Sequence, residues 1–386
     1  MKKIIVSLLN KIVPRVMNDA ELLDHVLGIA YKNMHLAEKI GRNAFSIACR
    51  EFYKTNLDHP SYVSVDPQAT FPRRFIEYLF ENQNRLSSLK EELFQGTDEL
   101  SQAVIHRFSS IYETVLNFEH SRLNAAVTES KEPEPLLIPI RWVLSSLEQE
   151  EELRLKQKYQ NVTIPDYDFA GKFSYQQIDY ASRFGWDYVD SSCRNLAGKD
   201  VIDGGAHIGD TALVFSELQP KSIHSFEPTP QTFELLKSVI RKNGKEGIIV
   251  PNQKALGKES GRLQFYFNNN QEDTAASVFP DEQRQICEVE CTTIDNYVQK
   301  HSLNVGLIKL DIEGAEFDAV LGATETIRQF KPALIIGLYH APKDFYEIKP
   351  YLAQLGLEYQ FLFRQVPYSY AGINARIKLI AFSKPK

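Results

Sequence analysis

Apolar residues recur at three- and four-residue spacing through residues 1–127 of the 386-residue chain, as at Leu22 and Val26. This spacing places apolar side chains on one face of a helix. Prolines interrupt the pattern twice, because proline and the residue before it resist helical geometry. We therefore predict a mainly helical domain over residues 1–135. It contains no catalytic signature, so we assign it by elimination to substrate recognition, a lid or assembly, including assembly into a homo-oligomer.

A charged stretch at residues 128–135, Thr-Glu-Ser-Lys-Glu-Pro-Glu-Pro, has no apolar periodicity and is the best candidate for a linker. Residues 136–198 then form a connecting segment, with a helical pattern over 140–158 and many aromatic residues over 167–188. We expect these aromatic side chains to pack against the sheet that follows, with the alternative that one or two form the floor of a cofactor pocket.

From residue 199 to the end, apolar runs rich in β-branched residues alternate with helical patterns. This alternation is typical of a doubly wound parallel sheet. The last two predicted strands lie close together and indicate a closing hairpin. The fold class is therefore α/β, with a Rossmann-like sheet of seven strands preceded by the helical domain. The predicted strands are residues 201–203, 222–226, 247–251, 306–314, 333–340, 358–364 and 376–383.

The first of these strands ends in a turn of small residues, Asp-Gly-Gly-Ala-His-Ile-Gly at 203–209, and an apolar helical run follows. Gly205 and Gly209 let the backbone approach a ligand closely and adopt positive φ angles. The helix that starts near Asp210 directs free N–H groups and a partial positive charge into the turn. The carboxylate of Asp203 suits a ligand with a cationic amino acid group better than one with a pyrophosphate. Strand, turn and helix together predict a nucleotide-binding turn.

The turn resembles two known patterns to different degrees. The dinucleotide fingerprint Gly-x-Gly-x-x-Gly, counted from Gly204, has Ala206 in place of its second glycine. The pattern Asp-x-Gly-x-x-x-Gly fits at every position and resembles motif I of the class I S-adenosylmethionine-dependent methyltransferases. The methyltransferase pattern is therefore favoured.

Polar residues also follow the second and third strands. Glu227 and Pro228 end the second strand, and Glu227 lies 24 positions after Asp203. That spacing is near the value expected for a carboxylate that binds ribose hydroxyls. The third strand leads to a loop at 253–257, which includes Ala255 and is expected to border an adenine.

Three further polar residues end the fourth and fifth strands, Asp311, Glu313 and His340. Ligands of open α/β sheets bind at the carboxyl ends of the strands. We therefore expect these side chains to lie at the same sheet edge as Asp203 and Glu227. Lys309, Asp311 and Glu313 are two residues apart and point to one face as long as the strand continues.

In combination, these motifs resemble the FkbM-type family of S-adenosylmethionine-dependent methyltransferases. The resemblance covers residues 199–386 and leaves out the helical half. The matching segments, in chain order, are Asp-Gly-Gly-Ala-His-Ile-Gly at 203–209, Phe-Glu-Pro at 226–228, Thr-Ile-Asp at 293–295, Ile-Lys-Leu-Asp-Ile-Glu-Gly-Ala-Glu at 308–316, Val-Leu-Gly at 320–322, and Tyr-His at 339–340 with Asp344.

The resemblance implies transfer of a methyl group from S-adenosylmethionine to a hydroxyl oxygen, and we expect that hydroxyl to belong to a sugar of a glycan or glycolipid precursor. A closing antiparallel hairpin is also expected of a methyltransferase sheet. The cofactor-binding residues that follow from the motifs are Asp203, Gly204, Gly205, Ala206, His207, Gly209, Glu227, Pro228 and Ala255.

Methyl transfer is an in-line displacement at a sulfonium methyl, so the hydroxyl must be positioned and must lose a proton. His340 or Asp311 is the expected base, Glu313 the expected contact to substrate or metal, and Lys309 the group that steadies the carboxylates. A divalent metal on Asp311 and Glu313 would itself acidify the hydroxyl. Both routes stay open at this level.

The chain departs from the family pattern at two places. His207 stands where the family usually has asparagine; its ring still offers a hydrogen bond to a cofactor carboxylate but also titrates. Gly337 and Leu338 stand where many members have a glutamate on the fifth strand, which leaves Tyr339 and His340 as the polar groups there.

The amino-acid composition indicates which classes of partner and which cellular compartment to expect. The 43% hydrophobic and 24% charged fractions are those of an ordinary folded protein. A formal net charge of −6 lacks the basic footprint of nucleic-acid binding, so no nucleic-acid partner is expected. The 4 cysteines are few for the length, which indicates a reducing compartment. No stretch approaches the ~20 apolar residues of a membrane span. We therefore expect a soluble, cytoplasmic protein.

Two alternatives to a methyltransferase stay open. A nicotinamide-dependent oxidoreductase would need the glycine that Ala206 replaces, and its sheet would not end in a hairpin. A scaffold that uses the methyltransferase fold only for binding would not need Asp203, Glu227 and Asp311, all of which are present.

Overall fold

The computed structural model describes residues 63–65, 78–110, 113, 136–138, 145–163, 165–169, 182–267, 276–277, 285–365 and 377–384. The chain divides into two compact units. The first contains residues 1–67, 131–143 and 370–372, and the second contains residues 68–130, 144–369 and 373–386. In the first unit, strands β1 (Val63–Val65) and β2 (Leu136–Ile138) form an antiparallel pair. Residues 1–62 lie outside the described residues, so the helical domain predicted for 1–135 stays a prediction there.

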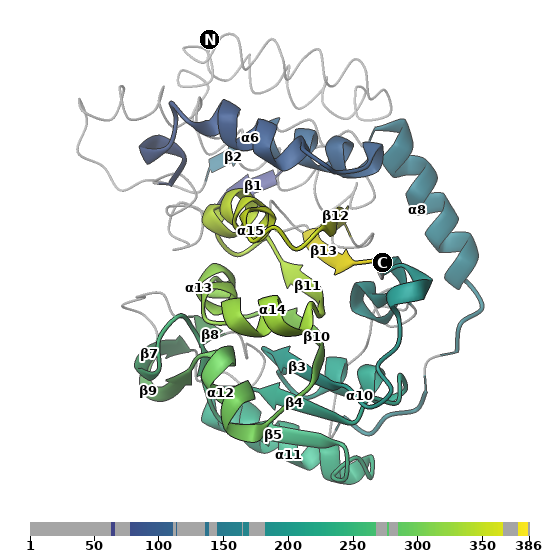
Figure 1. Ribbon diagram of the computed structural model, residues 1–386, viewed down its shortest axis with the longest axis vertical. Coiled ribbons are helices and arrows are strands. Elements are labelled where there is room, and N and C mark those ends of the chain that lie inside the picture. Colours follow the sequence, from purple (N-terminus) through teal and green to yellow (C-terminus); the bar gives the residue numbers. More distant parts are fainter. Residues whose placement is uncertain are drawn as a thin grey trace, which may run out of the picture. The chain divides into compact units, whose positions relative to one another are not determined.

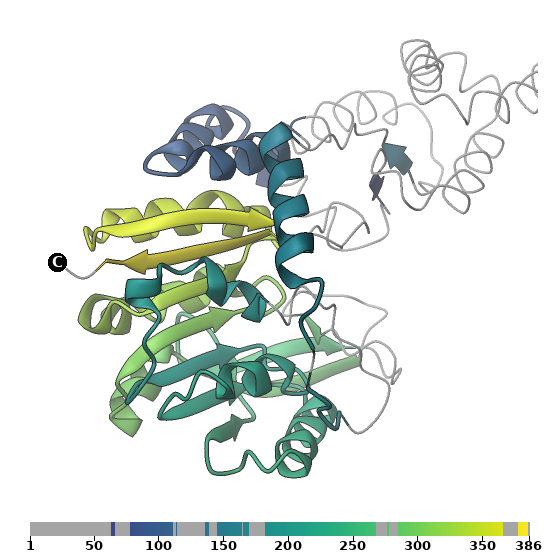
Figure 2. The same ribbon diagram turned by 90° about the vertical axis from the view of Figure 1, so that its right-hand side faces the viewer.

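The second unit is built on a seven-stranded sheet with the order β12-β13-β11-β10-β3-β4-β5. Strands β3, β4, β5, β10 and β11 are parallel, and β13 is antiparallel to both β11 and β12. This confirms the predicted α/β fold with its closing hairpin, which is the yellow pair beside β11 in Figure 2. The bounds of the strands are β3 Asp200–Gly204, β4 Ser222–Phe226, β5 Ile249–Asn252, β10 Val305–Leu310, β11 Ala333–Gly337, β12 Tyr359–Gln365 and β13 Ile377–Ser383.

Strand β3 lies at the point where the order of the sheet reverses. The chain proceeds from β3 through β4 to β5 on one side, while β10 pairs with β3 on its other side. Figure 1 shows β3, β4 and β10 next to one another in the middle of the second unit. Ligands of doubly wound sheets bind at such a switch point, outside the carboxyl ends of the strands. The loops after β3 and β10 are therefore the place to look for a site.

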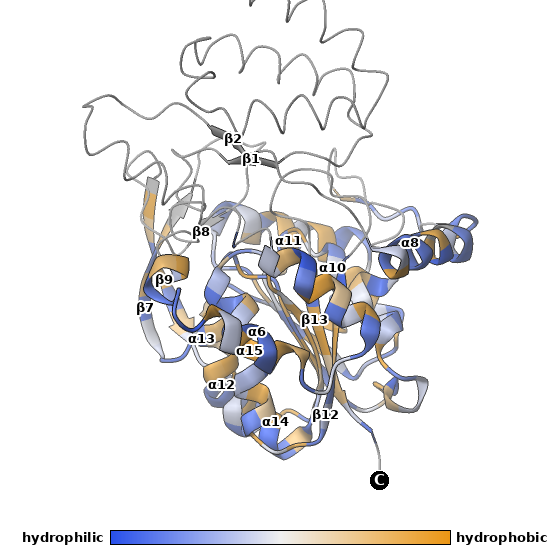
Figure 3. Cartoon of the chain, turned by 90° about the horizontal axis from the view of Figure 1, so that it is seen from above, coloured by the Kyte–Doolittle hydropathy of each residue, from blue (hydrophilic) through white to orange (hydrophobic). Residues whose placement is uncertain are grey.

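Helices cover both faces of this sheet. Helices α10 and α11 pack against β4 and β5, while α12, α13, α14 and α15 cover the other face. Figure 3 shows the apolar strands between these two groups of helices. The helix bounds are α10 Asp210–Ser216, α11 Pro230–Lys242, α12 Ile294–His301, α13 Glu316–Leu321, α14 Thr324–Phe330 and α15 Pro342–Gln354.

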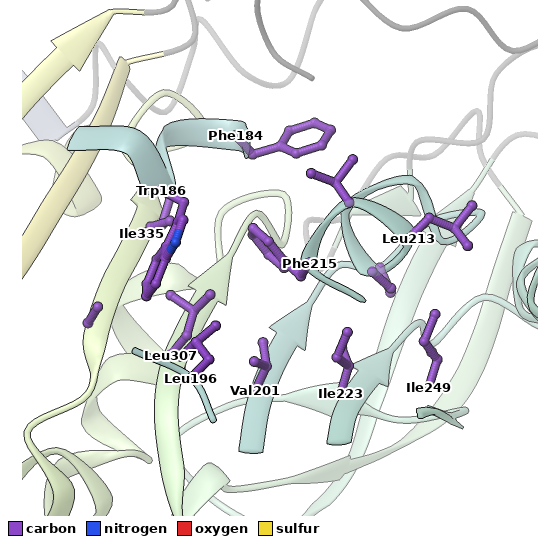
Figure 4. Packing of buried hydrophobic residues seen from close by; sticks show 14 of the residues in the cluster. Phe184, Trp186, Leu196, Val201, Leu213, Phe215, Ile223, Ile249, Leu307 and Ile335 are labelled. Atoms are coloured by element: carbon purple, nitrogen blue, oxygen red, sulfur yellow. The ribbon is translucent and has the colours of Figure 1, made fainter. Parts of the chain in front are cut away.

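The hydrophobic core lies beneath α10 and a short 3-10 helix, η1 (Arg183–Tyr188). Strand residues from one face of the sheet, such as Val201, Ile223 and Leu307, contribute to it and are fully buried. Trp186 of η1 and Phe215 of α10 close this cluster (Figure 4). The aromatic residues that were expected to pack against the sheet do so where the structure describes them. A second 3-10 helix, η2 (Ser191–Cys193), leads toward β3.

A smaller sheet of four strands follows β5, with the order β6-β9-β7-β8. It packs a small cluster from Ala255, Phe265, Val289 and Cys291. The chain returns from it through Thr293, which caps α12, and Asp295, which accepts the backbone N–H groups of Glu325 and Thr326. The bounds are β6 Ala255–Leu256, β7 Gly261–Phe267, β8 Ala276–Ser277 and β9 Gln285–Thr292.

Apart from β1, most of the described part of the predicted helical half is helical. Helix α6 (Leu86–Phe94) contacts α15, and residues 99–110 form a further helix. A bidentate ion pair connects the start of this further helix to β12. The Arg364 guanidinium donates to both carboxylate oxygens of Asp98. Helix α8 (Ser146–Tyr159) starts with a capping box formed by Ser145 and Glu148. Within the described ranges, no helix is both long and apolar enough to cross a membrane.

The fourth and fifth strands end earlier than their apolar patterns suggested. Strand β10 ends at Leu310 and β11 at Gly337. Asp311, Glu313 and His340 therefore lie in loops, and Glu313 adopts a left-handed conformation with φ 58°. The alternation expected for Lys309, Asp311 and Glu313 stops where the strand stops, so these three side chains have different surroundings.

Candidate active site

The turn after β3 requires glycine at two positions. Gly205 has φ +70°, and a Cβ built on it would lie 1.8 Å from the carbonyl oxygen of Asp311. Gly209 has φ +96°, caps α10, and a Cβ there would lie 2.9 Å from Leu236 Cδ1. Any larger residue would push the turn away from the β10 loop or from α11. The glycines predicted for a close backbone approach are thus needed for the packing of the turn itself.

Asp203 and Lys309 form a buried ion pair beneath this turn. Lys309 Nζ lies 3.1 Å from Asp203 Oδ1, and the two side chains are 6% and 0% exposed. Lys309 also donates to the carbonyl oxygens of Gly204 and Gly205, at 2.9 and 2.8 Å. Burial would lower the pKa of Lys309, but the carboxylates of Asp203, Asp311 and Asp210 together outweigh it and raise that pKa. Lys309 therefore stays charged and fixes the start of the turn.

The Asp203 carboxylate also contacts two hydroxyl side chains of the protein, those of Thr211 and Ser225. Both of its oxygens accept the Thr211 hydroxyl at 2.9 Å, and Ser225 Oγ lies 3.4 Å from Oδ2. Since the side chain is fully buried, its contact is with the turn and with α10. Direct contact between Asp203 and a cofactor stays a prediction.

His207 and Glu227 face each other across the turns after β3 and β4. The backbone N–H groups of Thr229 and His207 both donate to the Glu227 carboxylate, the former at 2.8 Å. Burial raises the pKa of Glu227 to about 7, and these two N–H groups oppose the rise. Burial and the charge of Lys309 lower the pKa of His207 to about 4, so its ring is neutral near pH 7. The titration expected for His207 near neutral pH is shifted to acid pH.

Ala206, Pro228 and Ala255 are the remaining residues predicted to bind the cofactor, and they differ in exposure. Ala206 is fully buried, Pro228 is half-buried, and Ala255 is 4% exposed within the small sheet. The side chain of Ala255 packs with Phe265 and Cys291. Contact of these three residues with an adenosine stays a prediction.

A second cluster surrounds His340 in the loop after β11. Its Nδ1 lies 2.8 Å from Glu316 Oε1, and its Nε2 lies 3.4 Å from Glu313 Oε2 and 3.7 Å from Asp311 Oδ1. Tyr339 donates its hydroxyl to Asp311 Oδ1 at 2.6 Å. The structure thus brings together all three catalytic candidates from the ends of β10 and β11, Asp311, Glu313 and His340, while Lys309 pairs with Asp203.

The charges of this cluster favour a protonated histidine and an ionised aspartate. Burial alone would lower the pKa of His340, but the carboxylates of Glu316, Glu313 and Asp311 outweigh it and raise that pKa to about 10. Burial would raise the pKa of Asp311, but His340 and Lys309 outweigh it and hold that pKa below its usual value. Near neutral pH, Asp311 is therefore able to accept a proton and His340 is not.

The two clusters adjoin along the edge of the sheet. Lys309 is paired in register with Asp203, and the Asp311 N–H donates to the Gly204 carbonyl at 3.2 Å. The turn after β3 therefore touches the first residue of the loop that bears the carboxylates. A ligand held on the turn would present one end to Asp311.

Two carboxylates of the cluster were not predicted as site residues. Glu316 is fully buried and accepts the backbone N–H groups of Ile312 and Gly314 as well as binding His340. Asp344 is 1% exposed, and its Oδ1 accepts the Phe317 N–H at 3.0 Å. Both residues occur in the family-like segments, so a signal existed. Each also lies at the start of a helix, where an acidic residue usually serves only the helix.

The residues described above could bind a cation at the His340 cluster and a cofactor at the glycine turn. One ligand atom each from Asp311, Glu316 and His340 lies within 4.8 Å of the others, a spacing that would suit a metal ion. The sequence predicted Asp311 and Glu313 for that role. On the other side, the glycine turn and Glu227 would suit an adenosine with its ribose. The arrangement would allow proton transfer from a hydroxyl to Asp311.

Comparisons with known proteins point to one family. Residues 203–361 match the family model described as the methyltransferase FkbM domain. The chain is similar to methyltransferase 1 of Beauveria bassiana, with 23% identity over 177 residues, which cover 40% of this chain and 71% of that protein.

Two solved structures show some similarity to this chain. Methyltransferase FkbM from Methylobacillus flagellatus KT is 16% identical, has a TM-score of 0.48, and the match covers 80% of this chain and 61% of that chain. A Streptococcus mutans protein, solved in complex with SAH, is 11% identical and has a TM-score of 0.33 over 55% of this chain and 100% of that chain.

Proposed function

From the premise that residues 203–361 form a methyltransferase FkbM domain, we propose that the chain is an S-adenosylmethionine-dependent O-methyltransferase. Its acceptor is a hydroxyl, on a sugar of a glycan or glycolipid precursor. The proposal is supported chiefly by one observation, the contact between the glycine turn and the Asp311 loop. Because of that contact, a methyl donor bound on the turn would lie next to a proton acceptor on the Asp311 loop.

The donor side consists of the turn after β3 and the end of β4. The close approach of Gly205 to the β10 loop leaves no room for a side chain and holds the turn against that loop. Glu227 presents a buried carboxylate at the position expected for the ribose hydroxyls. Asp203 and Lys309 hold this turn in place from below.

The cofactor, when bound, supplies an electrophilic methyl group on a sulfonium. Transfer of that methyl group to the acceptor oxygen would need an in-line approach and loss of the hydroxyl proton. Asp311 is assigned as the group that takes this proton, because it is ionised and partly exposed. Tyr339 donates to one oxygen of Asp311 and so orients the carboxylate. His340 holds a positive charge beside it.

The acceptor side suits a polyhydroxyl compound. Asp311 and Glu313 have side chains that are 31% and 44% exposed, and both are acceptors for hydroxyl groups. Two carboxylates at one opening are able to bind neighbouring hydroxyls of a sugar ring. This supports a sugar acceptor over an apolar one.

The test is binding followed by product analysis. Calorimetry on the full chain is expected to show binding of S-adenosylmethionine and no binding of a reduced nicotinamide cofactor. Incubation with labelled cofactor and a panel of sugars is then expected to give an O-methyl sugar, identified by mass spectrometry. Binding of the nicotinamide cofactor alone would favour the oxidoreductase. Binding of neither cofactor would favour a scaffold that uses this fold without catalysis.

We also propose a role for the helical domain and a cellular location. The helical domain of residues 1–135 would serve assembly or substrate recognition, and the protein would act in the cytoplasm. Size-exclusion chromatography with light scattering on the full chain would test the homo-oligomer.

A further inference from the structure

We propose that Tyr297 of α12 is a positioning residue for the cofactor site, because its side chain holds the ends of β4 and β5, next to Glu227. This inference rests on the function proposed above, since it assigns Tyr297 a role in binding S-adenosylmethionine. Tyr297 is 4% exposed, and both partners of its hydroxyl are protein groups. Any effect of Tyr297 on the cofactor is therefore transmitted through other residues.

The Tyr297 hydroxyl lies between polar side chains of two neighbouring strands. It donates to Asn252 Oδ1 of β5 at 2.9 Å, and His224 Nδ1 of β4 lies 2.9 Å from the same hydroxyl oxygen. The Asn252 amide is oriented by its Nδ2, which donates to the Val250 carbonyl at 2.9 Å. Oδ1 therefore faces Tyr297 and takes its proton. The hydroxyl oxygen is left to accept, so the His224 Nδ1 carries the hydrogen.

His224 is held from its other ring nitrogen as well. Its Nε2 lies 2.9 Å from Ser222 Oγ, and Ser222 donates to the buried Asp200 carboxylate at 2.7 Å. The residue is 6% exposed, and burial lowers the pKa of His224 to about 4, so the ring is neutral near pH 7. A shift of the ring would leave a buried N–H without a partner, which is costly. The Tyr297 hydroxyl is thus fixed from the β4 side.

The ring of Tyr297 connects α12 to the glycine turn. It packs edge to face on Phe226, the last residue of β4, with ring centroids 4.8 Å apart. The Phe226 carbonyl oxygen accepts the N–H groups of Gly205 and Ala206, at 3.0 and 2.9 Å. A displacement of Phe226 would therefore displace the turn that is proposed to bind the cofactor.

The hydroxyl of Tyr297 connects α12 to Glu227. Asn252 accepts this hydroxyl through its side chain and accepts the Glu227 N–H through its carbonyl oxygen, at 3.0 Å. The Glu227 carboxylate is the group proposed to bind the ribose. Loss of the hydroxyl would free Asn252 to move, and Glu227 would move with it. A tyrosine with only a structural role would affect stability, whereas a positioning tyrosine also affects the affinity for the cofactor.

The test is calorimetry with S-adenosylmethionine on the full chain carrying Tyr297→Phe. Phenylalanine keeps the ring on Phe226 and removes only the hydroxyl, so the variant is expected to fold, which circular dichroism checks. The dissociation constant is expected to rise about three- to tenfold, the factor that corresponds to one hydrogen bond of ordinary strength.

The matched control is Tyr359→Phe. It also removes a buried tyrosine hydroxyl, which donates to the Pro332 carbonyl at 2.7 Å and belongs to the edge strand β12. This control is expected to lose stability without a change in the dissociation constant of S-adenosylmethionine.

A double-mutant cycle assigns the effect to the hydrogen bond. Asn252→Ala removes the acceptor of the same bond, so the double variant is expected to weaken binding by less than the product of the two single factors. If the unaltered chain bound no S-adenosylmethionine, the proposed function and this inference would both fail. If it bound the cofactor and folded Tyr297→Phe bound it equally well, this inference alone would be overturned. Single factors that multiply in the double variant would overturn it too.

Discussion

Lys309 Nζ lies 3.1 Å from the Asp203 carboxylate on the neighbouring strand, and both side chains are buried beneath the glycine turn. The same ammonium donates to the carbonyl oxygens of Gly204 and Gly205. One cation therefore joins the two central strands and fixes the start of the turn. A buried charge is tolerated only when it is paired and hydrogen-bonded, so the state of this pair controls both stability and the shape of the turn.

Lys309→Met is expected to lower the free energy of unfolding by about 3–5 kcal/mol, because it leaves the Asp203 carboxylate buried without its cation. Urea unfolding followed by circular dichroism measures the loss. Lys221→Met is the control. Lys221 Nζ also lies near a carboxylate, 3.7 Å from Asp200 Oδ2, but the Lys221 side chain is 57% exposed. That variant is expected to change stability by less than about 1 kcal/mol. Equal losses for both variants would contradict the role assigned to Lys309.

Gly205→Ala is expected to disrupt the turn, because the new Cβ would lie 1.8 Å from the Asp311 carbonyl oxygen. The matched control is Gly244→Ala. Gly244 has a similar φ of +63°, but a Cβ there meets no described atom within 4 Å. The control isolates the strain of a left-handed alanine, which costs about 1–3 kcal/mol.

Calorimetry with S-adenosylmethionine and thermal unfolding measure the two effects. Gly205→Ala is expected to lose cofactor binding and to unfold at a lower temperature than Gly244→Ala. If Gly205→Ala were as stable as Gly244→Ala and still bound the cofactor, the close contact between the turn and the Asp311 loop would not exist.

Much of the central sheet was predictable, because each parallel strand is an apolar run and each ends in a distinct polar residue. The turn at 203–209 was equally clear, since its glycines occupy the positions where φ is positive or a Cβ would clash. The prediction failed at the ends of β10 and β11. Apolar residues such as Ile312 and Leu338 continue the pattern after the hydrogen bonding of the strand has stopped.

The partners of His340 could not be deduced from spacing. Glu316 follows Glu313 by three residues and begins α13, and Asp344 lies in the first turn of α15. Both positions have an ordinary explanation, the attraction of acidic residues to helix starts. Their convergence on His340 depends on how α13 and α15 pack together, which is a property of the tertiary structure.

Cofactor affinity is expected to rise with pH through about 7. Burial raises the pKa of Glu227 to about 7, so its carboxyl is protonated below this pH and ionised above it. The ionised form would accept two ribose hydroxyls, whereas the protonated form has fewer acceptor sites. The dissociation constant of S-adenosylmethionine, measured by calorimetry between pH 6 and pH 8, should therefore fall as pH increases.

Glu227→Gln should bind the cofactor more weakly and without this pH dependence. Asp210 also has a pKa raised by burial, to about 6, and is the other group that titrates nearby. Asp210→Asn serves as the control and should keep the step near pH 7. A step that is lost in Asp210→Asn and kept in Glu227→Gln would assign the titration to Asp210 instead.

Asp311→Asn is expected to lower kcat by about 10²–10⁴-fold while the dissociation constant of S-adenosylmethionine changes little, because a general base acts on the acceptor and not on the donor. The pH profile separates Asp311 from His340. The pKa of Asp311 is held below its usual value, so kcat should be flat from pH 6 to pH 8. The pKa of His340 is raised to about 10, and a base with that pKa would make kcat rise tenfold per pH unit over the same range.

Tyr339→Phe tests independently whether Asp311 is the general base. Removing its hydroxyl leaves Asp311 without the hydrogen bond of 2.6 Å that orients it, so kcat should fall while KM for the cofactor is retained. Tyr351→Phe, which removes a hydroxyl that bonds Thr324 instead, should keep full activity. A kcat that climbs steadily to pH 10, together with an active Asp311→Asn variant, would transfer the role of base to His340. Asp311 would then serve only to hold the imidazole in place.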